Sequence, residues 1–371
     1  MDETDIQKGT LPTPEDEDDV RPPVTEVGVL GWIKANLFNG WINSILTLMM
    51  LFMLWKTVPP FTKWAFVDSV WLTSGKACHA AAGACWSVVT QNYRFILFGF
   101  FPYEQQWRPL LAMLMLFALL FCSRDRTRWK KPLLYAWIIG LAVMGLLMKG
   151  GLFGLQSVDS TQWGGLPLTL ILSIFGLTAA YPLGVVLALG RQSRMPAVKT
   201  ICVAYIEAIR GVPLISLLFM GSIIFPLFLP EGVTINKILR AQVAIILFTA
   251  AYIAEVVRGG LQGMSKGQYE AADALGLNYY LTMRLVILPQ ALKIVIPPTV
   301  SILISAFKDT SLVVIIALYD LLKTTQSTLQ DPRWMGFSAE AYIFIAIIYF
   351  ICCFYLSNFS RKIERELDTG H

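Results

Sequence analysis

A polar stretch at residues 258–296 lies between two strongly apolar segments and carries residue types suited to binding another protein. Glu270 offers a negative charge that an arginine or lysine of a partner could pair with. Ala271 and Ala272 have side chains small enough to let a partner approach closely. Gly276 allows a sharp turn, because glycine readily adopts positive φ. This pattern predicts a docking helix; the alternative is an ordinary amphipathic helix that lies at the membrane interface.

Local signals divide this stretch into two short helices. Ser265 and Gln268 have the spacing of a capping box, so the first helix is expected to begin there. Gly276 is expected to end it. Asn278 can cap a second helix, which Pro289 is expected to end or kink.

Charged residues inside an apolar segment form a second candidate site. Lys308 and Asp309 would each cost roughly 2.5 to 3.5 kcal/mol near the centre of a spanning helix, so they should face the protein interior. They suit the carboxylate and the ammonium of a zwitterion, and a structural ion pair is an equally weighted alternative. Thr310 and Ser311 could bind along the same pathway or bond to their own helix.

Two further pairs of opposite charge are three residues apart. Glu207 and Arg210 can meet on one helix, so we favour a structural pair over a gate or a substrate contact. Glu255 and Arg258 are expected to form a surface pair.

Signatures of catalysis are missing from the sequence. It contains no GxxxxGK[ST] loop, so the chain is not expected to bind ATP in that manner. It also contains no GxSxG or HExxH motif. With two histidines and six cysteines that lack zinc spacing, neither a catalytic nor a metal site is expected. The net charge of +5 does not imply a nucleic-acid partner, because basic loops of membrane proteins account for it.

Composition indicates which elements must position these residues. The chain of 371 residues is 56% hydrophobic and 15% charged, whereas soluble proteins are roughly 25% charged. Its apolar runs are continuous and do not alternate, which predicts an all-α membrane protein. Eight segments approach the roughly 20 residues that a spanning helix needs. They are Leu37–Lys56, Pro109–Ser123, Pro132–Lys149, Leu166–Gly190, Lys199–Leu229, Arg240–Val257, Pro297–Leu318 and Ala341–Phe359. The fifth is long enough to kink at Pro213 or Pro226.

The distribution of charge predicts the orientation and the regions. Basic residues gather at 124–131, 191–199 and 258–293 and after the last segment, which places these loops and both chain ends in the cytoplasm. Residues 57–108 then form an outer loop within an accessory membrane region, 31–162. The core is residues 163–371. The acidic, proline-rich residues 1–30 are expected to be a disordered tail.

Two cysteines lie in the predicted outer loop. The stretch Ala77–Val89 favours a small helix, on which Cys78 and Cys85 would be about 10 Å apart. A disulfide usually needs a Cα separation below about 7 Å. We therefore favour free thiols over a bridge.

The polar stretch also resembles a family motif. Glu270-Ala271-Ala272, three residues, Gly276, nine residues, and then Val-Ile-Leu288-Pro289 resemble the EAA loop of ABC-importer permeases, with valine where isoleucine is usual. Further similarity to the polar amino-acid branch lies in Tyr205–Leu214, Ala251–Gly260, Lys266–Gln268, Leu288–Leu292 and Lys308–Leu312. The resemblance spans about Trp163–Arg365. The whole chain resembles a permease subunit of a bacterial general L-amino-acid ABC importer.

The resemblance implies a MetI-like five-helix permease core preceded by three extra helices, in the bacterial inner membrane. It implies a transport subunit, not an enzyme, that couples through Glu270, Ala271, Ala272, Gly276, Leu288 and Pro289 to separate ATPase subunits. Those partners would bind ATP and Mg, and this chain would hold no cofactor. A second permease subunit, the same chain or a homologous one, and a periplasmic amino-acid-binding protein would complete the importer. The alternatives are an ion-gradient-driven secondary amino-acid transporter, in which an EAA loop has no role, and a membrane receptor or scaffold.

Overall fold

The computed structural model describes residues 28–367, which fall into two compact units that divide between Ser69 and Val70. The first unit contains α1 (Gly28–Leu37) and α2 (Trp41–Thr62), and α2 continues as a π-helical turn to Val67. The Thr47 hydroxyl donates to the Leu37 carbonyl at 2.7 Å and ties the two helices together. The predicted tail lies outside the described residues except for its last three residues, which begin α1.

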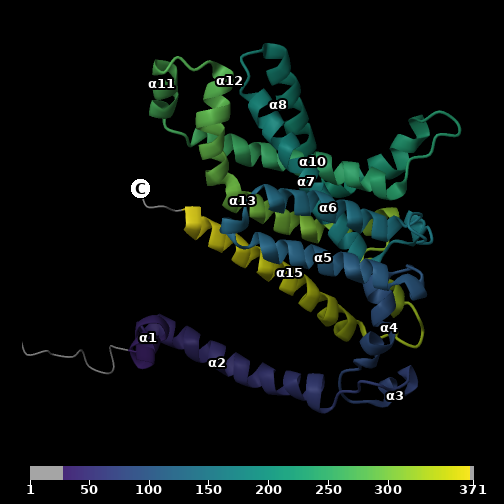
Figure 1. Ribbon diagram of the computed structural model, residues 1–371. Coiled ribbons are helices and arrows are strands. Elements are labelled where there is room, and N and C mark those ends of the chain that lie inside the picture. Colours follow the sequence, from purple (N-terminus) through teal and green to yellow (C-terminus); the bar gives the residue numbers. More distant parts are fainter. Residues whose placement is uncertain (1–27, 368–371) are drawn as a thin grey trace, which may run out of the picture. The chain divides into compact units, whose positions relative to one another are not determined.

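The second unit is built from helices, and its described residues contain two isolated β-bridges but no named strand (Figure 1). The helices of the predicted accessory region are α3 (Gly75–Ala80), α4 (Ser87–Phe98), α5 (Trp107–Ser123) and α6 (Lys131–Lys149). The core helices are α7 (Gly165–Arg191), α8 (Pro196–Arg210), α9 (Leu214–Phe219), α10 (Lys237–Gln262), α11 (Lys266–Ala274), α12 (Tyr279–Leu281), α13 (Leu288–Asp309), α14 (Leu321–Leu329) and α15 (Ser338–Leu367).

Helices α7 and α10 form the central pair of the core. Small residues recur every fourth position on α7, at Gly176, Ala180, Gly184 and Ala188, and all four are buried. A Cβ atom at Gly184 would lie 2.6 Å from the Ile253 side chain of α10. Small residues let membrane helices approach closely, and this stripe therefore fixes the two helices that carry much of the candidate site.

The number of apolar spans agrees with the sequence prediction. Seven described helices are long and apolar enough to cross a membrane, and there are eight if the bent pair α8–α9 counts as one span. That pair bends by 103° between Arg210 and Leu214, at the predicted kink. The cause is Pro213, which disfavours helical geometry in the residue before it.

Two predicted boundaries are wrong. The loop predicted at 57–108 begins later than residue 57, because α2 and its π-helical turn continue to Val67 and include Pro59 and Pro60. Pro289 neither ends nor breaks its helix: α12, a π-helical turn at Thr282–Ile287 and α13 run on as one long span. Pro289 follows closely on the π-helical turn, where the hydrogen-bond pattern of the span changes.

The prediction of free thiols at Cys78 and Cys85 is also wrong, because the two residues form a disulfide with a Cα separation of 5.5 Å. The predicted single helix does not form: α3 ends at Ala80, and the chain turns back before α4. The Cys85 N–H donates to the buried carboxylate of Glu340 at 2.8 Å. This long-range contact holds the turn that brings the two sulfur atoms together.

Candidate functional site

The polar stretch folds as a helix, a turn and a second helix at one end of the second unit (Figure 1). Gly276 has φ +69°, the left-handed conformation expected from the sequence. The Leu277 N–H donates to the Ala272 carbonyl at 3.1 Å, which closes the end of α11 in the manner of a Schellman turn. The Asn278 side chain accepts from the Leu281 N–H at 2.9 Å, so the predicted second cap is confirmed.

The capping-box prediction at the start of α11 is half right. The helix does begin after Ser265, but the Ser265 side chain makes no capping hydrogen bond. The Gln268 side chain instead accepts from the Gln290 amide at 2.9 Å. This bond connects α11 to α13, so a displacement of the short helix would be passed directly to a spanning helix.

The exposed side of the turn differs in part from the one predicted. Glu270, Ala271 and Gly276 are exposed, whereas Ala272 is 1% exposed and packs inward. Leu288 is half-buried and Pro289 exposed. The sequence analysis did not select Leu275, Tyr279 and Tyr280, which are 78%, 58% and 63% exposed. The sequence signal that could have identified these three residues is their large, mainly apolar side chains next to a predicted glycine turn.

A cluster of charges joins the ends of α7, α8 and α10 that lie nearest this turn. Arg191 Nη1 lies 2.9 Å from Glu207 Oε1 and 3.3 Å from Glu255 Oε2. Arg210 Nη1 lies 3.8 Å from the same oxygen of Glu255. Arg258 Nε donates to Glu255 Oε1 at 2.8 Å. The predicted Glu207–Arg210 pair is therefore wrong, because each residue pairs across helices; the Glu255–Arg258 pair is confirmed, but it is half-buried.

A cavity of about 320 Å³ lies between α9, α10 and α13. Its lining residues are Leu214, Ile245, Phe248, Thr249, Tyr252, Ser301, Ile302, Ser305, Ala306 and Asp309. The volume is at the lower end of the roughly 300–1,000 Å³ typical of small-molecule sites. Hydroxyl groups and one carboxylate interrupt an otherwise apolar wall, so the cavity can hold a small amphiphilic molecule.

The predicted pathway residues separate around this cavity. Asp309 is half-buried and lines it, whereas Lys308 is exposed and is not among the lining residues. Thr310 is fully buried and donates to the Phe307 carbonyl at 2.7 Å, so it bonds to its own helix. Ser311 is half-buried and outside the lining. On another side, the Arg210 guanidinium lies 5.7 Å from the ring centre of Tyr252, a lining residue.

Comparison with known proteins identifies the family to which the core region is similar. The family described as "Binding-protein-dependent transport system inner membrane component" matches residues 180–369, about half of the chain. The chain belongs to this family. Membership favours the permease interpretation over a secondary transporter or a receptor, and it makes the chain a multi-pass membrane subunit. Permeases of this family work with ATPase subunits and a substrate-binding protein.

Relatives match the accessory region as well as the core. The inner membrane amino-acid ABC transporter permease protein YhdY of Escherichia coli (strain K12) is 46% identical, over 91% of this chain and 93% of its own length. The glutamate/glutamine/aspartate/asparagine transport system permease protein BztC of Rhodobacter capsulatus is 38% identical, over 94% and 96%. A solved structure titled "Crystal structure of an amino acid ABC transporter with histidines" is 32% identical over 54% of this chain and 92% of its own, with a TM-score of 0.49.

Proposed function

We propose that this chain is the permease subunit of an ATP-driven importer of L-amino acids and that the cavity beside Asp309 lies on the translocation pathway. The observation that carries the proposal is this cavity, in which a carboxylate and several hydroxyl groups face an apolar wall. The amino-acid permeases similar to the chain over nearly its full length support the substrate class.

The charges around the cavity suit a zwitterion. Asp309 offers an anion to a substrate ammonium, and the hydroxyl groups of Ser301 and Ser305 offer hydrogen bonds. Arg210, beside Tyr252, offers a cation for the α-carboxylate once its long contact with Glu255 opens. A change in the ion-pair cluster would therefore alter the affinity of the cavity for substrate.

The exposed turn around Gly276 is the surface that we assign to the ATPase subunits. Glu270 supplies one charge, and Leu275, Tyr279 and Tyr280 supply exposed apolar area for docking. ATP and Mg would be bound by those subunits, with no catalysis and no cofactor in this chain. A periplasmic amino-acid-binding protein and a second permease subunit, the same chain or a homologous one, complete the proposed importer.

In this proposal the Gly276 turn and both chain ends are cytoplasmic, and residues 68–106 are outside. The basic loop at 124–131 supports that orientation. Single cysteines placed at Arg128 and at Glu104, in a chain whose own cysteines are replaced, should react differently with an impermeant thiol reagent in intact cells. Labelling at position 128 but not at 104 would reverse the orientation and reject the cytoplasmic turn.

Replacement of Asp309 by asparagine tests the pathway assignment. The Asp309→Asn variant should assemble with its ATPase but take up amino acids at least tenfold more slowly, because the ammonium loses its anion. Lys308→Gln changes the charge of the exposed neighbour and should retain most of the uptake. An assembled Asp309→Asn complex with normal uptake would reject the assignment, and loss of assembly would assign a structural role to Asp309.

A further inference from the structure

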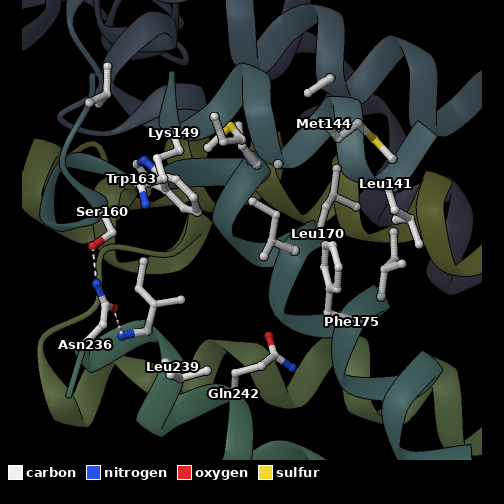
Figure 2. Close-up of a pocket in the computed structure, with 18 of the residues that line it drawn as sticks. Leu141, Met144, Lys149, Ser160, Trp163, Leu170, Phe175, Asn236, Leu239 and Gln242 are labelled. Atoms are coloured by element: carbon white, nitrogen blue, oxygen red, sulfur yellow. Dashed lines mark hydrogen bonds between the residues drawn. The ribbon is translucent and has the colours of Figure 1, made fainter. Parts of the chain in front are cut away.

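A second and larger cavity, of about 540 Å³, separates the accessory helix α6 from the core helices α7 and α10 (Figure 2). Helix α5 closes one side of it. The cavity has one polar end, where Lys149, Ser160 and Asn236 lie, and an apolar end at Leu141 and Phe175. Leu141 and Lys149 are eight positions apart in the sequence, which corresponds to about 12 Å along α6.

Two buried polar atoms in the cavity wall lack a hydrogen-bond partner among the described residues, which indicates that the occupant is not a pure hydrocarbon. The indole nitrogen of Trp163 and the side-chain oxygen of Gln242 are buried and have no hydrogen-bond partner among the described residues. Gln242 is 9% exposed, and its oxygen points into the space between the helices (Figure 2). Buried polar atoms of native proteins are normally paired, so these two atoms indicate an occupant with polar groups of its own.

The rim of the cavity carries one charge of each sign. Lys149 has an exposed side chain at the end of α6. Asp159 accepts from the Thr161 N–H at 2.8 Å. That hydrogen bond lowers the pKa of the Asp159 carboxyl, which is therefore anionic at neutral pH. A headgroup with both a phosphate and an ammonium would be neutralised at this rim.

We propose that this cavity binds one membrane phospholipid with a zwitterionic amino headgroup, in the leaflet opposite the Gly276 turn. Its phosphate lies at Lys149, its ammonium at Asp159, and an acyl chain extends between α6 and α7 toward Phe175. The Trp163 N–H can donate to an ester carbonyl, and the Gln242 oxygen can accept from a water that hydrates the ester region.

The shape of the cavity suits a lipid better than a transported amino acid. The cavity extends about 12 Å along α6 from its polar to its apolar end, which exceeds the length of an amino-acid side chain but suits a hydrocarbon chain. The charged groups lie only at the mouth, where a lipid headgroup would lie. The lipid would connect α6 to the core, and this proposal does not depend on which substrate the permease carries.

Gly145 provides a direct test. It lines the cavity, and a Cβ atom built on it has no atom within 4 Å, so a side chain can begin there without a clash. The complete complex with its ATPase is purified in mild detergent, and the retained lipids are counted by native mass spectrometry. Wild type and Gly145→Ala should retain the aminophospholipid, and Gly145→Phe should retain at least fivefold less. Ala is the matched control, because it raises helix propensity without filling the cavity.

A second variant addresses the headgroup and does not alter the packing. Lys149→Gln removes the exposed cation, and rebinding of phosphatidylethanolamine to delipidated complex should weaken at least threefold. Phosphatidylglycerol, which has no ammonium, should bind wild type more weakly than phosphatidylethanolamine. Equal retention in Gly145→Phe and Gly145→Ala, equal binding of the two lipids, or a bound amino acid or partner helix in place of lipid would each overturn the proposal.

Discussion

The two ends of the second unit are stabilised in different ways. At the end near Gly276, five charged side chains on α7, α8 and α10 form four ion pairs, three of them across helices, and all five side chains are at least partly exposed. At the other end, a disulfide closes a turn within residues 70–106, and the buried Glu340 carboxylate and the fully buried Trp334 hold this segment to the core. Partly exposed ion pairs contribute little to the free energy of unfolding and can break and re-form with other partners. Disulfides and buried hydrogen bonds contribute more and do not exchange partners in this way.

This difference indicates that one end can rearrange while the other is held rigid. Arg108 illustrates the rigid end: it is 1% exposed and donates to the carbonyls of Leu147 and Gln156 at 2.7 and 2.9 Å. An importer must open toward each side in turn, and the end that faces the ATPase must move with it. The predictions below test whether function and stability divide between the two ends.

The largest effect is expected at Gly276. A valine there must adopt φ +69°, which costs an L-residue about 1–2 kcal/mol and a β-branched one more. Because no atom lies within 4 Å of a Cβ at this position, the cost is conformational and not a clash. Gly276→Val should lower ATP-driven uptake in proteoliposomes at least tenfold while the complex still inserts.

Gly276→Asn is the matched control, since asparagine tolerates the left-handed region. It should retain clearly more uptake than Gly276→Val. Equal loss in both variants would mean that the side chain itself blocks docking, and normal uptake in Gly276→Val would reject the coupling role of the turn.

The Gly276 turn could be predicted from sequence because its signals are local. The effects of Gly276 and Asn278 are confined to the backbone of the turn itself. The positive φ of Gly276 and the cap made by Asn278 were therefore predicted correctly. The disulfide could not be predicted, because the Glu340 contact that holds its turn comes from 255 residues away in the sequence. The partners of Glu207 and Arg210 were missed for the same reason. Helical spacing identifies neighbours on one helix and says nothing of the helices packed beside it.

The next largest effect is expected at the rigid end. Replacing Cys78 and Cys85 together by serine should lower the free energy of unfolding by about 2–3 kcal/mol, through lost restriction of the unfolded chain. The thermal midpoint of the purified complex should fall, and uptake at 25 °C should stay near wild type. Impaired uptake in a fully assembled double variant would place residues 70–106 on the transport pathway and remove the contrast between the two ends.

A smaller effect is expected in the ion-pair cluster. Glu255→Gln removes the carboxylate shared by Arg191, Arg210 and Arg258 and should cost about 1–2 kcal/mol, since these groups are only partly buried. Substrate-independent ATPase activity should rise, because the helix ends are less tightly joined. Glu207→Gln, which removes one ion pair, serves as the control and should show a weaker effect. Equal effects would assign no special position to Glu255.

The smallest effect is a pH dependence at the rigid end. Asp320 is 0% exposed, and burial raises the pKa of its carboxyl to about 6, although the N–H groups of Leu322 and Lys323 at the start of α14 partly oppose this. The raised pKa means that the folded protein favours the protonated acid. The stabilisation that the protonated Asp320 carboxyl provides is full below the ordinary pKa of 3.8 and is lost as the pH rises through about 6. Between pH 5 and pH 7.5 the free energy of unfolding should therefore fall by about 1 kcal/mol because of this group, and the thermal midpoint of the complex should fall with it.

Asp320→Asn keeps a capping side chain that does not titrate, and it should remove this part of the pH dependence. An unchanged pH profile in that variant would show that the Asp320 carboxyl has the same charge throughout this range.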